Sequence, residues 1–215
     1  MDGREMLRMM KNALAEGEKT ALAEVGEKER SPFAVLISTV LSHRTRDEKT
    51  SEAAKRLFSR FREPKDLAAA EEGEVAELIR GVGFYRNKAK AIIAIAKEIV
   101  RRGGVVPNTI SELMELPSVG RKTANCVLAY GFGIEAIPVD THVHRIANRL
   151  GIAKTKTPEE TEAELEKFFE KEDWGEVNNI FVLFGKRICR PISPKCKICP
   201  MTDECRYFQE KRRSD

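Results

Sequence analysis

A lysine and an aspartate, eighteen residues apart, are the side chains of this sequence best suited to covalent chemistry. Lys122 lies in the stretch LPSVGRKTA, which covers residues 116–124 and is expected to open a helix. The helix dipole disfavours a cation in the first turn, and partial burial acts in the same direction, so the amine of Lys122 becomes a potential nucleophile. Asp140 precedes another helical segment, where it is expected to cap the helix, to serve as a catalytic carboxylate, or both.

The stretch around Lys122 is predicted to be a hairpin between two helices. Pro117 cannot continue the first helix, and Gly120 is expected to supply the backbone freedom that the turn needs. Apolar side chains from Ala124 to Ala129 predict the second helix. Backbone N–H groups at its start favour an anion, and a DNA phosphate is a suitable one. The residues that would present them are Ser118, Val119 and Gly120.

Four of the five cysteines are clustered near the C-terminal end, and their spacing indicates a metal site. They are Cys189, Cys196, Cys199 and Cys205. The N-terminal residues show no signal peptide, so disulfides are not the expected use of these thiols. By spacing alone, a zinc ion and an iron–sulfur cluster both fit four cysteines. Cys126 stands apart in an apolar helix and is interpreted as a buried structural residue.

LPSVGRKTA, the later motif VDTHVHR at residues 139–145 and the cysteine spacing together resemble the helix–hairpin–helix DNA glycosylases, and among them the endonuclease III branch. The resemblance covers roughly residues 32–207. It implies a [4Fe-4S] cluster on the four cysteines. It also implies that Lys122 attacks C1′ of a flipped-out nucleotide and forms a Schiff base, after which β-elimination cuts the strand on the 3′ side, while Asp140 stabilises the cationic sugar.

The loop that follows an apolar helix at residues 33–41 is the second region to which the resemblance assigns a role. Thr45 and Glu48 have capping-box spacing for a helix over residues 46–61, and a capped loop with incidental charge is the alternative. The family usually has glutamine in this loop, where this chain has His43 and Arg44, which are expected to contact DNA. The resemblance also places two residues near the damaged base, namely Ser42 and Asp47.

The remaining sequence predicts an all-α protein, because no stretch shows sustained two-residue alternation. Glycines 81 and 83 are interpreted as a helix-packing turn before a helix over residues 85–102. Two helical domains are expected, with the active site in the cleft between them. Residues 26–134 would form a helical barrel that carries the hairpin, and residues 1–25 would pack with residues 135–215, which carry the cysteine loop.

Charge and composition indicate a DNA-binding protein without a membrane segment. The net charge is +4, but residues 186–215 hold nine Lys and Arg against four Asp and Glu, so this end carries +5 and the rest −1. Such a basic patch suits phosphate neutralisation, although a solvated tail is the alternative. We expect a soluble, cytoplasmic monomer that binds double-stranded DNA containing damaged bases or abasic sites.

The resemblance favours a bifunctional DNA glycosylase and abasic-site lyase acting on oxidised pyrimidines such as thymine glycol. Relatives that lack the lysine are monofunctional, and the mismatched-adenine type carries a further C-terminal domain for which 215 residues leave no room. Two alternatives stay open. One is a mismatch uracil or thymine glycosylase, because His43 and Arg44 alter the pocket. The other is a non-catalytic iron–sulfur DNA-binding module, which would need neither Lys122 nor Asp140.

Overall fold

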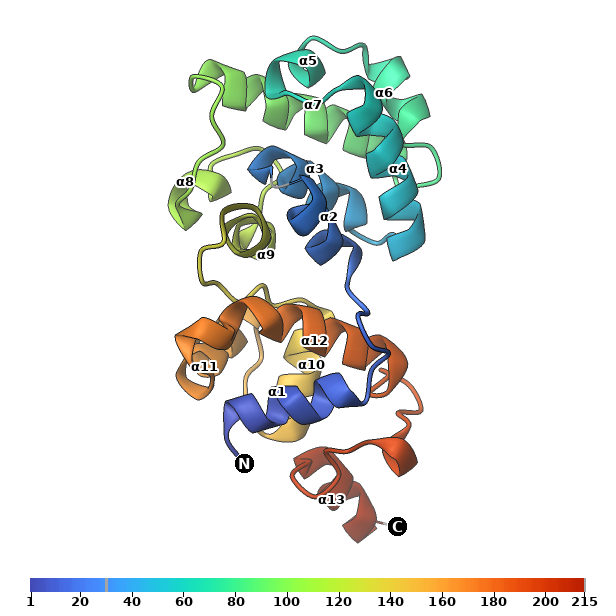
Figure 1. Cartoon of the computed structure of the whole chain (residues 1–215), viewed down its shortest axis with the longest axis vertical. Coiled ribbons are helices and arrows are strands. Elements are labelled where there is room, and N and C mark those ends of the chain that lie inside the picture. The colour runs from blue at the N-terminus through green and yellow to red at the C-terminus, as the bar shows by residue number, and fades with distance from the viewer. Residues whose placement is uncertain (30, 215) are drawn as a thin grey trace. The chain divides into compact units, whose positions relative to one another are not determined.

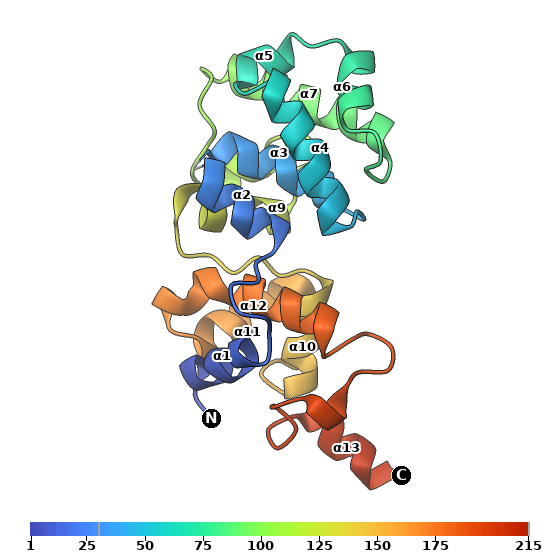
Figure 2. The ribbon, with the colours of Figure 1, turned by 45° about the vertical axis from the view of Figure 1, so that its right-hand side comes forward.

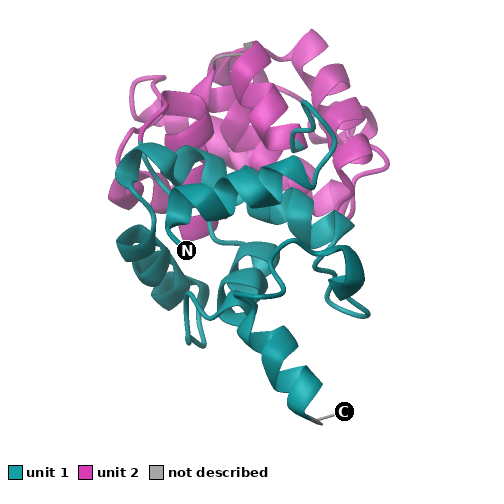
Figure 3. Cartoon of the chain, turned by 60° about the horizontal axis from the view of Figure 1, so that its bottom comes forward, with its two compact units in different colours: residues 1–20, 135–215 teal, residues 21–134 magenta. Residues whose placement is uncertain are grey.

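The computed structural model describes residues 1–29 and 31–214, and within these residues the regular structure is helical, with no strand. The chain divides into two compact units, shown in two colours in Figure 3. Unit 1 comprises residues 1–20 and 135–215, and unit 2 comprises residues 21–134. The N-terminal boundary predicted after residue 25 would have cut helix α2 (Ala21–Glu29), which is one continuous element packed on α3 and belongs wholly to unit 2.

Unit 2 is built around the apolar helix α3 (Pro32–Ser42). Ser31 caps it by accepting from the Ala34 N–H at 3.2 Å, and every residue from 33 to 41 is buried. Figures 1 and 2 both show α3 among α2, α4 and α9. The other elements are α4 (Asp47–Arg60), α5 (Pro64–Ala68), α6 (Glu72–Leu78), α7 (Tyr85–Arg101), α8 (Ile110–Met114), α9 (Arg121–Cys126) and the π-helix η1 (Val127–Phe132).

The helix that begins at Arg121 is longer than the sequence indicated. Apolar side chains predicted it only as far as Ala129, but the helical backbone continues beyond Cys126 as the π-helix η1 and ends at Gly133, whose φ of +66° is left-handed. The wider turns of η1 keep its apolar side chains against α2 and α3. Such π-helical turns are frequent at functional sites, and here one follows directly on the helix of Lys122.

Unit 1 joins the beginning of the chain to its C-terminal third. Its elements are α1 (Gly3–Asn12), α10 (Thr141–Leu150), α11 (Pro158–Phe168), η2 (Lys171–Asp173), α12 (Trp174–Arg187), η3 (Cys196–Ile198) and α13 (Arg206–Ser214). Thr157 and Glu160 form a reciprocal capping box at the start of α11, as their spacing predicts. Apolar side chains of α1, α10, α11 and α12 share one core, with Phe181 fully buried in it.

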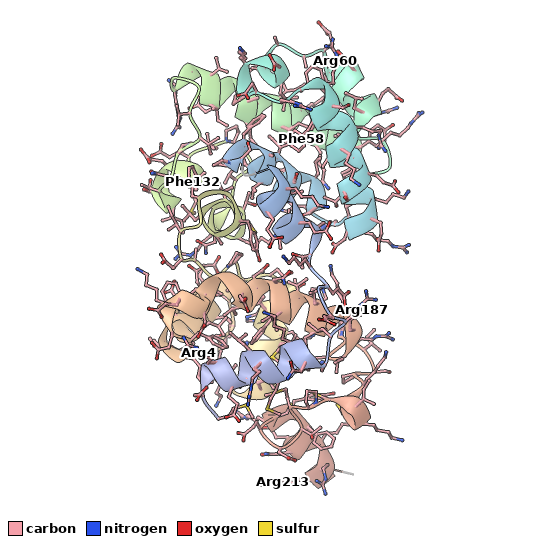
Figure 4. All side chains as sticks on the ribbon, viewed as in Figure 1. Arg4, Phe58, Arg60, Phe132, Arg187 and Arg213 are labelled. Carbon is pink, nitrogen blue, oxygen red and sulfur yellow. The ribbon has the colours of Figure 1, made fainter. Side chains whose placement is uncertain are left out.

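Two arginines labelled in Figure 4 belong to ion pairs that fasten the N-terminal segment to the rest of unit 1. Arg4 pairs with Asp173 at 3.2 Å, and Arg187 donates to Glu18 with its Nε at 2.9 Å. Because these pairs are exposed, we attribute most of the attachment to the buried apolar face of α1. Among the described residues, no helix combines the length and the apolar character needed to cross a membrane.

Candidate active site and cysteine pocket

Lys122 is the second residue of α9 and therefore lies in the first turn, as predicted. Its side chain is half-buried, and the next residue, Thr123, is almost completely buried at 2% exposure. No side chain caps this helix start, where Gly120 is the N-cap. The first N–H groups of any helix have no intrahelical partner, and here no N-cap side chain accepts from them either. Such N–H groups can bind an anion.

The left-handed residue of the hairpin is Ser118, not Gly120. Ser118 has a φ of +62°, whereas Gly120 has φ −99° and ψ 175°, an extended conformation open to any residue. The expectation that Gly120 supplies unusual backbone angles is therefore wrong. The turn closes through a hydrogen bond from the Val119 N–H to the Leu116 carbonyl at 3.2 Å, and this closure places the positive φ at Ser118. A serine in this conformation is strained.

His43 connects the loop after α3 to the helix of Lys122. Its Nε2 lies 3.3 Å from Oγ1 of Thr123, although the residue as a whole keeps substantial exposure. Partial burial, followed by the positive charges of Lys122 and Lys88, lowers the pKa of His43 to about 4. The ring is therefore neutral at physiological pH. Its contact residue, Thr123, directly follows Lys122 in α9.

The other predicted residues of this loop occupy different environments. Ser42 ends α3 and donates from Oγ to the Thr39 carbonyl at 2.8 Å, and Asp47 is the first residue of α4. Arg44 is exposed with a φ of +53°. The predicted capping box of Thr45 and Glu48 is absent, since Arg46 is the N-cap of α4 and makes no side-chain cap.

Thr45 does not cap α4 because its hydroxyl is engaged elsewhere. Oγ1 accepts from the Gly83 N–H at 3.1 Å and from Nζ of Lys88 at 3.0 Å. Lys88 was not among the residues predicted to matter, yet it is only 8% exposed. A signal for it was present in the sequence. Lys88 lies four residues before Ile92 and so continues the apolar stripe of α7 with a charged side chain.

Asp140 is the N-cap of α10, as predicted. One carboxylate oxygen, Oδ1, accepts from the backbone N–H groups of His142 at 2.8 Å and Val143 at 2.9 Å. The residue is half-buried. Lys122 and Asp140 belong to different units, Lys122 to unit 2 and Asp140 to unit 1.

The four clustered cysteines line a single pocket in unit 1. The pocket has an empty volume of about 380 Å³, including its opening to solvent, and apolar side chains such as Ile146 and Phe184 form the remainder of its wall. All four are free thiols. Burial is the main reason that the pKa of the Cys199 thiol rises to about 11, and the other three cysteines contribute in the same direction.

The chemistry of this pocket suits a metal group with sulfur ligands. Four cysteines are the donor set both of structural zinc sites and of iron–sulfur clusters. All four line the same pocket, whose remaining wall is largely apolar. Among the described side chains, no three of the metal-binding types are close enough together to hold a single ion in this structure.

Arg149 contacts one of the cysteine sulfurs directly, and it was not among the residues predicted from the sequence. Its Nη1 lies 3.4 Å from Sγ of Cys189 and 2.7 Å from the Arg190 carbonyl. The guanidinium also lies over the ring of Tyr207, 4.5 Å from its centroid. Arg187, which lies two residues before Cys189, pairs instead with Glu18. Arg149 thus holds the beginning of the cysteine loop.

Comparison with known proteins gives a consistent family assignment. Residues 37–171 match the model of the HhH-GPD superfamily of base excision DNA repair proteins. Endonuclease III of Thermotoga maritima is 49% identical over 189 residues, which are 87% of this chain and 89% of that protein. Endonuclease III of Bacillus subtilis is 39% identical over 183 residues, 84% of each.

Solved structures agree with this assignment. A non-covalent endonuclease III–DNA complex superposes with a TM-score of 0.86 at 37% identity and covers 98% of this chain and 96% of that one. A trapped endonuclease III–DNA covalent intermediate superposes with a TM-score of 0.81 at 34% identity over 99% of both chains.

Proposed function

The chain belongs to the HhH-GPD superfamily of base excision DNA repair proteins and, within it, to the endonuclease III family, and on this premise we propose that Lys122 and Asp140 perform its DNA glycosylase and abasic-site lyase chemistry. The observation that carries the proposal is the position of Lys122. It is a half-buried amine in the first turn of a helix with uncapped amides, beside an imidazole that stays neutral.

Lys122 would act as the nucleophile. Its neutral amine attacks C1′, the bond between C1′ and the base breaks, and the base leaves with the bonding electrons and takes up a proton. Loss of a proton from nitrogen and opening of the sugar ring give a Schiff base. Removal of a proton from C2′ then expels the 3′ phosphate by β-elimination, and water releases Lys122 from the cleaved product.

Asp140 would supply the negative charge that this sequence of steps needs. Positive charge develops on the sugar as the base departs, and a carboxylate stabilises it while also accepting or returning protons. The cap bonds to His142 and Val143 fix the carboxylate through one oxygen. A carboxylate held by its own backbone needs little reorganisation at the moment of reaction.

DNA would be held by two loops of unit 2. The hairpin amides of Ser118, Val119 and Gly120 would bind a backbone phosphate and fix the register. His43 and Arg44 would contact the DNA where the damaged nucleotide is flipped out, with Arg44 entering the gap or meeting a base edge. Ser42 and Asp47 would contribute to the base pocket.

The cysteine pocket would hold a [4Fe-4S] cluster through Cys189, Cys196, Cys199 and Cys205. When bound, the cluster supplies a structural cross-link to a loop that has little apolar core of its own. Arg149 would neutralise part of its negative charge. The basic residues of this end of the chain would then face DNA phosphates.

Oxidised pyrimidines are the proposed substrates, because the resemblance to endonuclease III implies them. The lysine and the carboxylate together would account for removing the base and cutting the strand. The mismatch uracil or thymine glycosylase and the non-catalytic module are less favoured, since neither requires this pair. A cytoplasmic, DNA-associated location is part of the same proposal.

The test is borohydride trapping on a duplex that contains one thymine glycol, with wild type, Lys122→Gln and, as a matched control, Lys97→Gln on the exposed side of α7. Wild type and the control should give a covalent adduct, and Lys122→Gln should give none. Base release without an adduct in wild type would contradict the nucleophile assignment, and the same assay on uracil and thymine mismatches would then test the first alternative.

A further inference from the structure

Lys88 uses a buried ammonium group to hold one loop of unit 2. Its Nζ donates to the Leu41 carbonyl at 2.8 Å, to Thr45 Oγ1 at 3.0 Å and to the His43 carbonyl. An ammonium has three N–H donors, and all three are directed at residues 41–45. Lysine is rarely this buried unless its charge has partners, and here these three hydrogen bonds offset the free-energy cost of burying the ammonium.

The same contacts tie a second loop to the first. Oγ1 of Thr45 accepts from the Gly83 N–H at 3.1 Å as well as from Lys88, and it donates to the His43 carbonyl at 3.2 Å, so the hydroxyl is saturated. The two backbones approach so closely that a Cβ on Gly83 would lie 2.8 Å from the Arg44 carbonyl oxygen. Residues 41–45 and 81–84 therefore form one assembly around Nζ of Lys88.

This assembly carries exposed residues in strained conformations. Arg44 and Phe84 have φ values of +53° and +57°, and Phe84 is 65% exposed. Non-glycine residues keep such angles only where their surroundings enforce them. At its inner side the loop presents His43 to Thr123, next to Lys122. The bonds of Lys88 join three positions of residues 41–45 to a single group, and so contribute to holding this shape.

We propose that Lys88 is a positioning residue that fixes the loops 41–45 and 81–84 as one rigid surface and thereby sets Arg44 and His43 for extrusion of the damaged base. The proposal rests on the proposed function. Burial lowers the pKa of Lys88 to about 8, so the group is still mostly protonated at neutral pH and keeps its three donors. Lys88 itself is not placed against substrate.

The role predicts unequal effects on two substrates. Extrusion of a paired base requires unstacking and unpairing, whereas an abasic site has no base to extrude. Lys88→Met should therefore lower excision of thymine glycol by about tenfold or more, because small misplacements of positioning groups have effects of this size. Cleavage at a preformed abasic site should change by less than about threefold, since Lys122 is held by α9 and not by Lys88. A purely structural defect would lower both rates together.

A second measurement does not depend on DNA. Hydrogen exchange of the Gly83 amide reports its bond to Thr45, so Lys88→Met should accelerate exchange at Gly83 and in residues 41–45. Lys97→Met on the exposed side of the same helix is the matched control and should leave exchange and both activities unchanged. Unchanged exchange at Gly83 in Lys88→Met would overturn the proposal, as would an equal loss of both activities.

Thr45 provides a test if Lys88→Met does not fold. Thr45→Val keeps the shape of the side chain but removes the acceptor, and Thr45→Ser restores it. Thr45→Val should reproduce the loss of base excision and Thr45→Ser should recover it, and failure of this recovery would count against the role of Lys88. Should wild type act on neither substrate, the proposed function fails, and the exchange measurement still decides whether Lys88 holds the two loops.

Discussion

The backbone N–H of Val143 donates to Oδ1 of Asp140 at 2.9 Å, and this oxygen also accepts from His142. Both cap bonds therefore use a single carboxylate oxygen. Capping a helix and stabilising a positive sugar make different demands, since the first needs an acceptor and the second needs a charge. The two demands can be separated by substitution.

Asp140→Asn should keep the cap and lose the charge. We expect the free energy of unfolding to change by less than about 1 kcal/mol, while the single-turnover rate of base release falls about 100-fold or more. Asp140→Ala removes the cap as well and should lose a further 1 kcal/mol or so of stability. Urea unfolding and quenched-flow kinetics measure the two effects. Equal activity of Asp140→Asn and wild type would remove Asp140 from the mechanism.

The lowered pKa of His43 predicts a stability change in acid. Its pKa falls from the ordinary 6.5 to about 4 in the folded protein, so the unfolded chain binds a proton more readily between these values. The contribution of neutral His43 is fully present above pH 6.5 and is lost progressively as the pH falls toward 4. In His43→Gln the urea midpoint should decline less steeply over this range than in wild type. Parallel curves for the two proteins would show that His43 titrates normally.

Replacement of the strained serine in the hairpin should stabilise unit 2. Ser118→Gly relieves a left-handed conformation that costs a serine roughly 1–2 kcal/mol, and the greater entropy of unfolded glycine offsets part of this gain. We expect a net increase of about 1 kcal/mol or less in the free energy of unfolding. Gly120→Ala is the comparison, because Gly120 has no positive φ and nothing lies near an added Cβ. If Gly120→Ala lowered the free energy of unfolding by more than Ser118→Gly raised it, the result would contradict the observed turn.

The cysteine pocket predicts which thiols bind iron. Cys196→Ala should purify with less iron and acid-labile sulfide than wild type, and its loop at residues 189–205 should be cut faster by protease. Cys126→Ala is the matched control, because Cys126 is completely buried within unit 2 and does not line the pocket. It should retain the iron content of wild type. If the purified native protein contained zinc and no iron, the result would instead support a single zinc ion bound by the four cysteines.

Much of the fold could be predicted from residue pattern, because the helices have strong local signals. Pro158 behind Thr157 and Asp140 before α10 mark helix starts, and both caps are present in the structure. Pro117 and the apolar residues after it predicted the hairpin, and cysteine spacing predicted the metal site. Family resemblance joined these features into one protein and gave them roles. The predicted helical character and family are confirmed by the structure and its relatives.

Contacts between distant segments could not be predicted in this way. Thr45 has the spacing of a capping residue, but its hydroxyl bonds to Lys88 and Gly83, about forty residues later. Gly120 has the composition of a turn residue, but closure through Val119 places the positive φ at Ser118. In the first case tertiary hydrogen bonds decided the outcome, which no local propensity reports. In the second case the bond that closes the turn decided which of its residues takes the positive φ.

Unit 1 is built from both ends of the chain, so it cannot fold until nearly the whole chain has been synthesised. When α1 leaves the ribosome, the partners of its charged and apolar faces have not been made, since Arg4 and Asp173 are 169 residues apart in sequence. Unit 2 is continuous and is complete once Ile134 has emerged. Domains form as units in the order of translation. Unit 2 is therefore expected to fold before α12 has been synthesised, whereas α1 can pack only after α12 has emerged. The cysteine loop and α13 are expected to be the last parts to fold.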